Sequence, residues 1–98
     1  MSELRFTWDD AKAAANRRKH GVSFEEAATV FADPLAMRFD DVDHSDEEDR
    51  FILIGTSIKG RLLLVVFVEP ESALIRIISA RRVTRRERED YFAKLGLG

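Results

Sequence analysis

The chain has 98 residues, of which 45% are hydrophobic, with a formal net charge of −2 and no cysteine. This length and composition predict one globular domain, spanning 1–98, and exclude a disordered chain, disulfides, thiol catalysis and cysteine-based metal sites. The sequence contains no run of 18 apolar residues, and Met1–Asp10 has no apolar signal-peptide core, so we expect a cytoplasmic protein without a membrane span.

The N-terminal residues predict a short strand followed by a helix. Leu4–Trp8 alternates apolar and polar side chains, as a half-buried strand does. Asp9 or Asp10 can cap a helix that runs to about His20, with Gly21 as its stop signal. Helical spacing predicts a face of this helix that packs against a sheet, made of Ala11, Ala14, Ala15 and Arg18. It predicts an opposite polar stripe, made of Lys12, Asn16, Lys19 and His20.

A second, shorter helix is predicted directly after the first. Ser23 and Glu26 form a capping-box pattern at its start, and Asp33-Pro34 ends it. Its inward side chains are expected to be Phe24, Ala27, Ala28 and Phe31.

Strand patterns dominate the rest of the chain. Ala36–Phe39 is weak, and the stronger strands are Arg50–Ile58, Arg61–Glu69 and Leu74–Ser79. Lys59-Gly60 predicts a tight hairpin turn and Pro70-Glu71 a second turn. Leu62–Val68 is apolar on both faces, which predicts a central strand. The last helix is predicted over about Thr84–Leu95, and Thr84 with Glu87 forms a capping box.

These elements predict an α+β fold. Their order, β-α-α-β-β-β-β-α, indicates a mostly antiparallel sheet of four to five strands, with two N-terminal helices and one C-terminal helix. Three short helices do not suffice to cover both faces of such a sheet. We therefore expect one face to depend on a partner for full cover.

The charge is divided unevenly along the chain. Residues 40–49 contain seven acids and no base, so the remaining residues hold 11 acids against 16 bases, a balance of +5. The near-neutral total therefore does not exclude a polyanionic partner. The acidic segment lacks the ligand spacing and central glycine of an EF-hand, so we expect a solvated loop there, with His44 solvated in it.

Six arginines lie within Arg76–Arg88, where a strand passes into the last helix. The planar guanidinium matches phosphate oxygens, and the free N–H groups of a helix start add to such a surface. A nucleic-acid backbone is the anion that fits this size and charge. The alternative is a solvated helix face with ordinary pairs, Arg85 with Glu89 and Arg86 with Asp90. Three arginines precede the helix and have no such partner: Arg76, Arg81 and Arg82.

RNA can be cleaved by its own 2′-hydroxyl without a metal or cofactor, if protein groups move protons and stabilise the anionic phosphorus. The candidate proton-transfer groups are Lys19, His20, Glu87 and Tyr91. His20 ends a helix whose dipole favours the protonated imidazole. Glu87 and Tyr91 share a helix face, although capping and core-edge packing explain them equally well. Two dispersed histidines do not make a metal site.

Several segments are specific in combination: Trp8-Asp9, Lys12, Asn16, Lys19-His20-Gly21-Val22-Ser23-Phe24-Glu25-Glu26-Ala27, Arg76-Ile77-Ile78-Ser79-Ala80-Arg81-Arg82, Glu87 and Tyr91. Together they resemble the BrnT toxins over nearly the whole chain. The resemblance implies a RelE-like ribonuclease toxin of a type II toxin–antitoxin pair, which inhibits translation, acts on RNA and needs no cofactor. It also implies a BrnA-like antitoxin that represses the shared operon, so that operator DNA is met only through the antitoxin.

The resemblance also implies a set of site residues. By position, the residues near the active site are Lys19, His20, Arg76, Arg81, Glu87 and Tyr91. The expected RNA-binding residues are Arg50, Arg61, Arg82 and, in the arginine-rich segment, Arg85. One departure concerns the hairpin after Val68, where the family often carries Thr-x-Arg and this chain has Glu69-Pro70-Glu71. The missing arginine is expected to weaken RNA binding.

Two other functions stay open at this point. One is a non-catalytic module that holds RNA or DNA, and the other is a protein-interaction domain whose arginines bind an acidic peptide. The enzyme is favoured because phosphate binding alone does not need proton-transfer groups.

Overall fold

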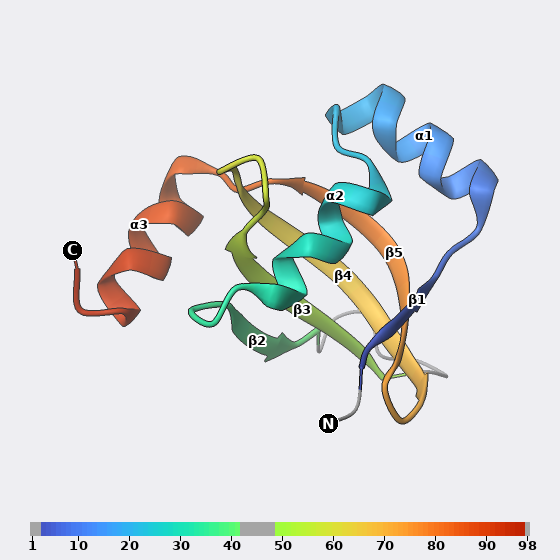
Figure 1. Ribbon diagram of the computed structural model, residues 1–98. Coiled ribbons are helices and arrows are strands. Elements are labelled where there is room, and N and C mark those ends of the chain that lie inside the picture. Colours follow the sequence, from blue (N-terminus) through green and yellow to red (C-terminus); the bar gives the residue numbers. More distant parts are fainter. Residues whose placement is uncertain (1–2, 42–48, 98) are drawn as a thin grey trace.

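The computed structural model describes residues 3–41 and 49–97 and shows a five-stranded sheet surrounded by helices (Figure 1). In chain order the elements are β1 (Arg5–Thr7), α1 (Asp10–His20), α2 (Phe24–Thr29), the 3-10 helix η1 (Val30–Ala32), β2 (Met37–Asp40), β3 (Arg50–Thr56), β4 (Leu62–Glu71), β5 (Leu74–Arg82) and α3 (Arg85–Lys94). The predicted α+β fold is confirmed. Most of the acidic segment, including His44, lies in 42–48, outside the described residues.

The strands lie in the order β1-β5-β4-β3-β2, so β4 is central, as its two apolar faces predict. Only β1 pairs in parallel, with β5, and the other three pairings are antiparallel. Alternate residues of β4 point into the core: Leu63, Val65 and Phe67. The core closes against side chains of α2 and its neighbours: Val22, Phe24, Ala27 and Val30.

Local capping signals set the helix ends where the sequence predicts them. The Asp9 carboxylate accepts from the backbone N–H of Ala11 and Lys12, and Gly21 ends α1 in the left-handed region at φ 69°. The capping box of Thr84 and Glu87 is present at α3.

The first predicted turn lies at Lys59-Gly60 but is longer than predicted, whereas the second is wrong in position. The backbone N–H of Ser57 donates to the carbonyl of Arg61 over 2.9 Å, so the β3–β4 turn extends beyond Lys59-Gly60. Pro70 and Glu71 belong to β4, and the chain reverses at Ser72 and Ala73 instead, with Ala73 at φ 64°. A register shift between Val68 and Glu71 releases the proline from the ladder, where it has no N–H to donate.

The predicted faces of α1 are also wrong. Asn16, predicted in the polar stripe, is buried at 7% exposure, whereas Ala11, Ala14 and Ala15 are exposed. The Asn16 amide donates to the carbonyls of Val22 (3.0 Å) and Ala80 (2.8 Å), and its oxygen accepts from the Ala80 N–H (3.1 Å). Strand β1 pairs only with 74–76, so Ala80 has no strand partner on that side. Asn16 supplies the missing partner, and α1 thereby covers this edge of β5 (Figure 1).

We expect Asn16→Ala to lower the free energy of unfolding by about 2–3 kcal/mol, because it leaves buried backbone groups without partners. Urea denaturation measures this change. Arg17→Ala is the control, since Arg17 is an exposed neighbour on the same helix. Equal stability of the two variants would show that Asn16 does not anchor α1.

Candidate nucleic-acid interface

The sheet face opposite α2 carries a basic and apolar surface, which we call the open face: Arg50, Ile52, Val66, Arg76, Ser79 and Arg81. Its composition follows from the register, because directly paired residues point to the same side. Val68 pairs with Arg50 on one side and with Arg76 on the other, so two arginines flank one apolar residue. In the next row, Val66 lies between Ile52 and Ser79. Val68 is buried, so the open face combines its arginines with apolar contact area from the half-buried Ile52 and Val66.

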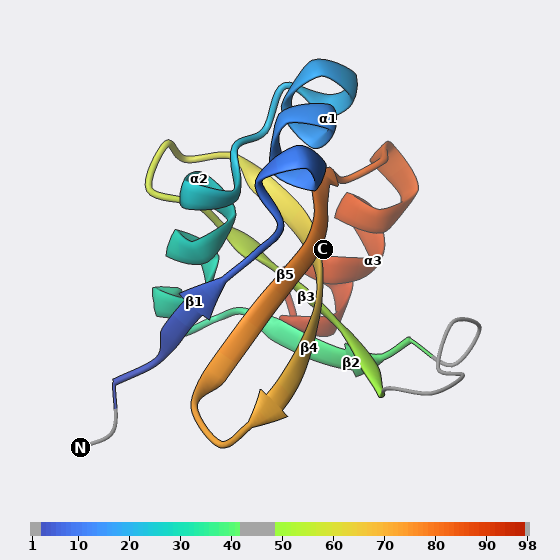
Figure 2. The same cartoon turned by 90° about the vertical axis from the view of Figure 1, so that its right-hand side faces the viewer.

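Helix α3 packs over one end of this face, on the opposite side of the sheet from α2 (Figure 2). Tyr91 is buried at 4% exposure, and its hydroxyl donates to the carbonyl of Leu35 over 2.9 Å. Burial, with the charge of Asp33, raises the pKa of Tyr91. The phenol therefore holds α3 against the segment before β2, and its proton is directed at a backbone carbonyl.

Arg81 and Glu87 form a two-pronged ion pair between the end of β5 and α3. The Nη1 of Arg81 donates to Oε1 of Glu87 over 2.8 Å, and Nη2 donates to Oε2 over 2.9 Å. Nη1 also donates to the carbonyl of Arg82 over 3.2 Å. A guanidinium has five N–H donors, so these bonds leave the Nε–H and one Nη2–H along its other edge. That edge is a ready two-donor site for a phosphate oxygen pair.

Glu87 is held as an anion. The hydrogen bonds from Arg81 lower its pKa to about 2, and the backbone N–H of Thr84 adds to the shift. A carboxylate with this pKa binds protons weakly at neutral pH, which disfavours a general base, whose pKa should lie near the working pH. The geometry suits Glu87 to position Arg81, whose own pKa is raised by the same pair.

Lys19, His20 and Arg82 lie around the edge of β5 that α1 covers. Asn16 binds Ala80 there, and Lys19 and His20 follow at the end of α1. Lys19 is exposed and His20 is half-buried. Arg82 pairs with Leu63, a core residue, so its side chain starts on the face opposite to Arg81. These residues therefore lie near the covered edge of β5 and not on the open face.

The remaining two predicted RNA-binding residues are engaged within the protein. Arg61 donates through Nε to the buried Glu26 carboxylate over 2.9 Å, and through Nη2 to Gly21 and Glu26. Arg85 donates to Glu89 over 3.3 Å on the exposed surface of α3, the pair that the solvated-face alternative predicts. The predicted set therefore does not converge on one point: Arg50 and Arg76 share the open face with Arg81 but lie further along it, and Glu87 and Tyr91 belong to α3.

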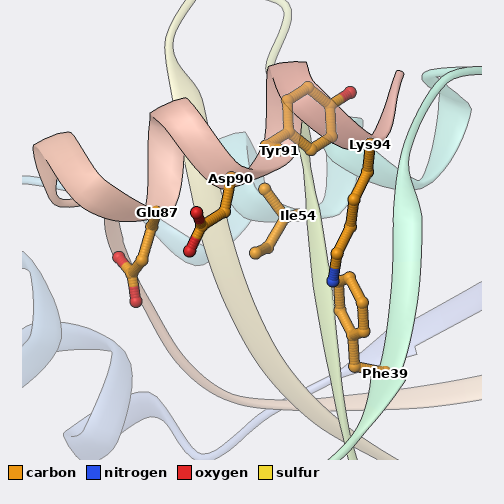
Figure 3. A pocket seen from close by; sticks show the side chains of 6 residues that line it. All are labelled: Phe39, Ile54, Glu87, Asp90, Tyr91 and Lys94. Carbon is orange, nitrogen blue, oxygen red and sulfur yellow. The ribbon is translucent and has the colours of Figure 1, made fainter. Parts of the chain in front are cut away.

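Three residues absent from the sequence prediction lie at the same place: Phe39, Asp90 and Lys94. With Ile54, Glu87 and Tyr91 they line a cavity between α3 and the sheet (Figure 3). The spacing of Glu87, Asp90 and Lys94 by three and four residues is a signal that could have found the helix side of this cavity. Phe39 could not have been found, because only the pairing of β2 with β3 brings it here.

Within 3–41 and 49–97, no three or more His, Asp or Glu side chains are grouped so as to hold a metal ion. In those same ranges, no helix has the length and apolar composition that crossing a membrane requires.

The fold and the open face define a small α+β domain that presents arginines and apolar side chains on one face of its sheet. Residues 8–87 match the family model described as the ribonuclease toxin, BrnT, of type II toxin–antitoxin systems. The chain therefore belongs to the BrnT family of ribonuclease toxins. Membership implies RNA as the target and a cognate protein antitoxin as the partner.

The fold is shared with a solved structure, the 1.1 Å crystal structure of the Brucella abortus ribonuclease toxin BrnT. The TM-score is 0.64 at 23% sequence identity, and the alignment covers 84% of this chain and 99% of that one. No curated protein matches the sequence.

Proposed function

We propose that the open face binds single-stranded RNA and that the protein cleaves it without a metal ion, thereby inhibiting translation. The observation that carries this proposal is the placement of Arg50, Arg76 and Arg81 on one sheet face beside α3. Guanidinium groups can neutralise phosphates, while the apolar rows between them can contact unstacked bases.

The reaction is an attack of the 2′-oxygen on the adjacent phosphorus. The 2′-O–P bond forms, the P–O5′ bond breaks, and the 2′-proton passes to a base while the leaving 5′-oxygen gains one. Arg81 stabilises the charge on phosphorus through its remaining donor edge, and Arg76 and Arg50 guide the backbone. Lys19 and His20, at the end of α1 that covers the edge of β5, are the proton-transfer groups, with Glu87 positioning Arg81.

We expect purified protein to cleave RNA equally well with and without EDTA, and to leave 2′,3′-cyclic phosphate or 3′-phosphate ends. The charge at phosphorus is neutralised by guanidinium groups, so chelation should not lower the rate. End-group analysis of the fragments makes the measurement. Arg81→Lys protein purified in parallel controls for a contaminating nuclease. Dependence on added Mg²⁺, with 3′-hydroxyl ends, would contradict the proposed mechanism.

A non-catalytic RNA-binding module is the second candidate, and one observation favours it. Glu87 and Tyr91, two of the four predicted proton-transfer groups, are held by Arg81 and by the Leu35 carbonyl. RNA binding without any cleavage in the same experiment would select this function. A domain that binds an acidic protein peptide would instead bind no RNA.

For the antitoxin we propose a BrnA-like protein with a DNA-binding domain, which represses the shared operon. Its toxin-binding segment is expected to be acidic and apolar, because the Arg76–Arg88 surface and the open face are basic and apolar. Covering either would mask the arginines of the interface.

A further inference from the structure

A small cavity lies between α3 and the sheet (Figure 3), and one of its lining residues, Glu87, is the partner of Arg81. It is lined by Phe39, Ile54, Glu87, Asp90, Tyr91 and Lys94, and its volume is about 150 Å³. Drug-sized ligands fill cavities of about 300–1,000 Å³, so this one suits a single flat ring system. Glu87, Asp90 and Lys94 extend from the same side of α3, and the ammonium of Lys94 reaches the ring of Phe39, which belongs to the sheet.

The polar groups of the cavity differ in the hydrogen-bonding capacity that remains for a ligand. Both oxygens of Glu87 already accept from Arg81. The side chain of Asp90, in contrast, is exposed and makes no hydrogen bond or ion pair with the residues that the structure describes. The ammonium of Lys94 lies 4.6 Å from the centroid of the Phe39 ring. The cavity therefore offers one acceptor pair, one cationic donor and one aromatic face.

We propose that this cavity binds a guanine base of the RNA substrate and gives the cleavage its base preference. This proposal rests on the proposed function. The base stacks on Phe39, Asp90 accepts from the N1–H and the 2-amino group, and Lys94 turns from the ring to donate to O6. Single-stranded RNA is commonly read in this way, by stacking on an aromatic side chain and by hydrogen bonds to the Watson–Crick edge.

The choice of guanine follows from the arrangement of its donors. Only guanine places two N–H donors side by side on its Watson–Crick edge, where a carboxylate can accept both at once. Adenine and cytosine offer a single amino group there, and uracil offers one N–H flanked by two carbonyl oxygens that repel a carboxylate. Asp90 therefore favours guanine, and the O6 atom beside these donors suits Lys94.

The cavity is connected to the phosphate site through Glu87. The same carboxylate lines the cavity and holds Arg81 by two hydrogen bonds of 2.8 and 2.9 Å. A base in the cavity therefore lies next to the phosphate on the free edge of Arg81. The preference is expected for the nucleotide adjacent to the cleaved bond.

The test maps cleavage on single-stranded oligonucleotides that differ only in one base. For the parent protein we expect cleavage next to guanine to exceed that next to the other bases by about tenfold or more, the size of a good two-pronged contact. Asp90→Asn should abolish this preference, because the amide presents N–H groups to the donors of guanine. Glu25→Gln, an exposed acid on α2, is the control and should keep the preference.

A base preference that Asp90→Asn leaves unchanged, or cleavage without preference, would overturn the inference while the proposed ribonuclease function stands. If the protein does not cleave RNA, binding of guanosine 3′-monophosphate and uridine 3′-monophosphate by calorimetry decides the matter. Tighter binding of the guanosine compound that is lost in Asp90→Asn supports the cavity as a guanine site. Equal affinities overturn it.

Discussion

Arg81→Lys is expected to lower the rate of RNA cleavage by about 10²–10³-fold, the loss seen when one donor to a developing anion is removed. Lysine keeps the charge but has no planar fork, so it cannot hold Glu87 by two bonds and also present a two-donor edge to phosphate. Single-turnover cleavage of a defined oligonucleotide measures the loss. Thermal unfolding of the variant shows whether the fold is retained.

The control for Arg81→Lys is Arg17→Lys, which makes the same change at an exposed position on α1. It should cleave like the parent protein. If Arg81→Lys also cleaves like the parent, the phosphate is not held by Arg81. The active site would then lie elsewhere, and Lys19 with His20 would be the first residues to substitute.

Two conservative variants test what Glu87 and Tyr91 contribute to cleavage compared with Arg81. Glu87→Gln keeps an acceptor for the capping box but removes the charge that orients Arg81, so its loss of activity should be smaller than that of Arg81→Lys. Tyr91→Phe removes only the hydroxyl that donates to Leu35. A lower cleavage rate in a variant whose free energy of unfolding is nearly unchanged would assign that hydroxyl to catalysis.

The sequence predicted the parts of this fold that depend on neighbouring residues. The capping box of Thr84 and Glu87 and the helix stop at Gly21 are local, and both are confirmed. The central place of β4 follows from its apolar composition on both faces. The turn after β4 was misplaced because Pro70 stands at an irregularity of the ladder, which depends on the register with β5.

The candidate site was predictable to the extent that it lies within one segment. Arg81 and Glu87 are six residues apart, and their pairing joins a strand end to the helix that follows it. Asn16 instead binds Ala80, 64 residues away, so its periodicity on α1 could not reveal that it is buried. The sequence likewise could not reveal the partner of Arg61, because Glu26 lies 35 residues earlier in the chain.

Breaking the Glu26–Arg61 ion pair is the second change for which we expect a large effect, here on the stability of the fold. The Glu26 side chain is 2% exposed and accepts from Arg61 and, over 2.7 Å, from the hydroxyl of Ser57. The bonds from Arg61 lower the pKa of Glu26, so the carboxylate is ionised although it is buried. Arg61→Met leaves that charge without its main partner. We expect the free energy of unfolding to fall clearly more than it does when an exposed ion pair is broken, as measured by urea denaturation.

Two matched variants show whether this loss comes from the buried charge. Arg85→Met breaks a pair with Glu89 whose side chains are 93% and 66% exposed, and it should cost less than about 1 kcal/mol. Adding Glu26→Gln to Arg61→Met removes the charge and should restore part of the lost stability. Arg61→Met could instead destabilise the fold as little as Arg85→Met does. If it then weakens RNA binding and lowers the slope of log K against log salt concentration by about 1, Arg61 contacts an RNA phosphate as the sequence predicts. The ion pair would then contribute little to the fold.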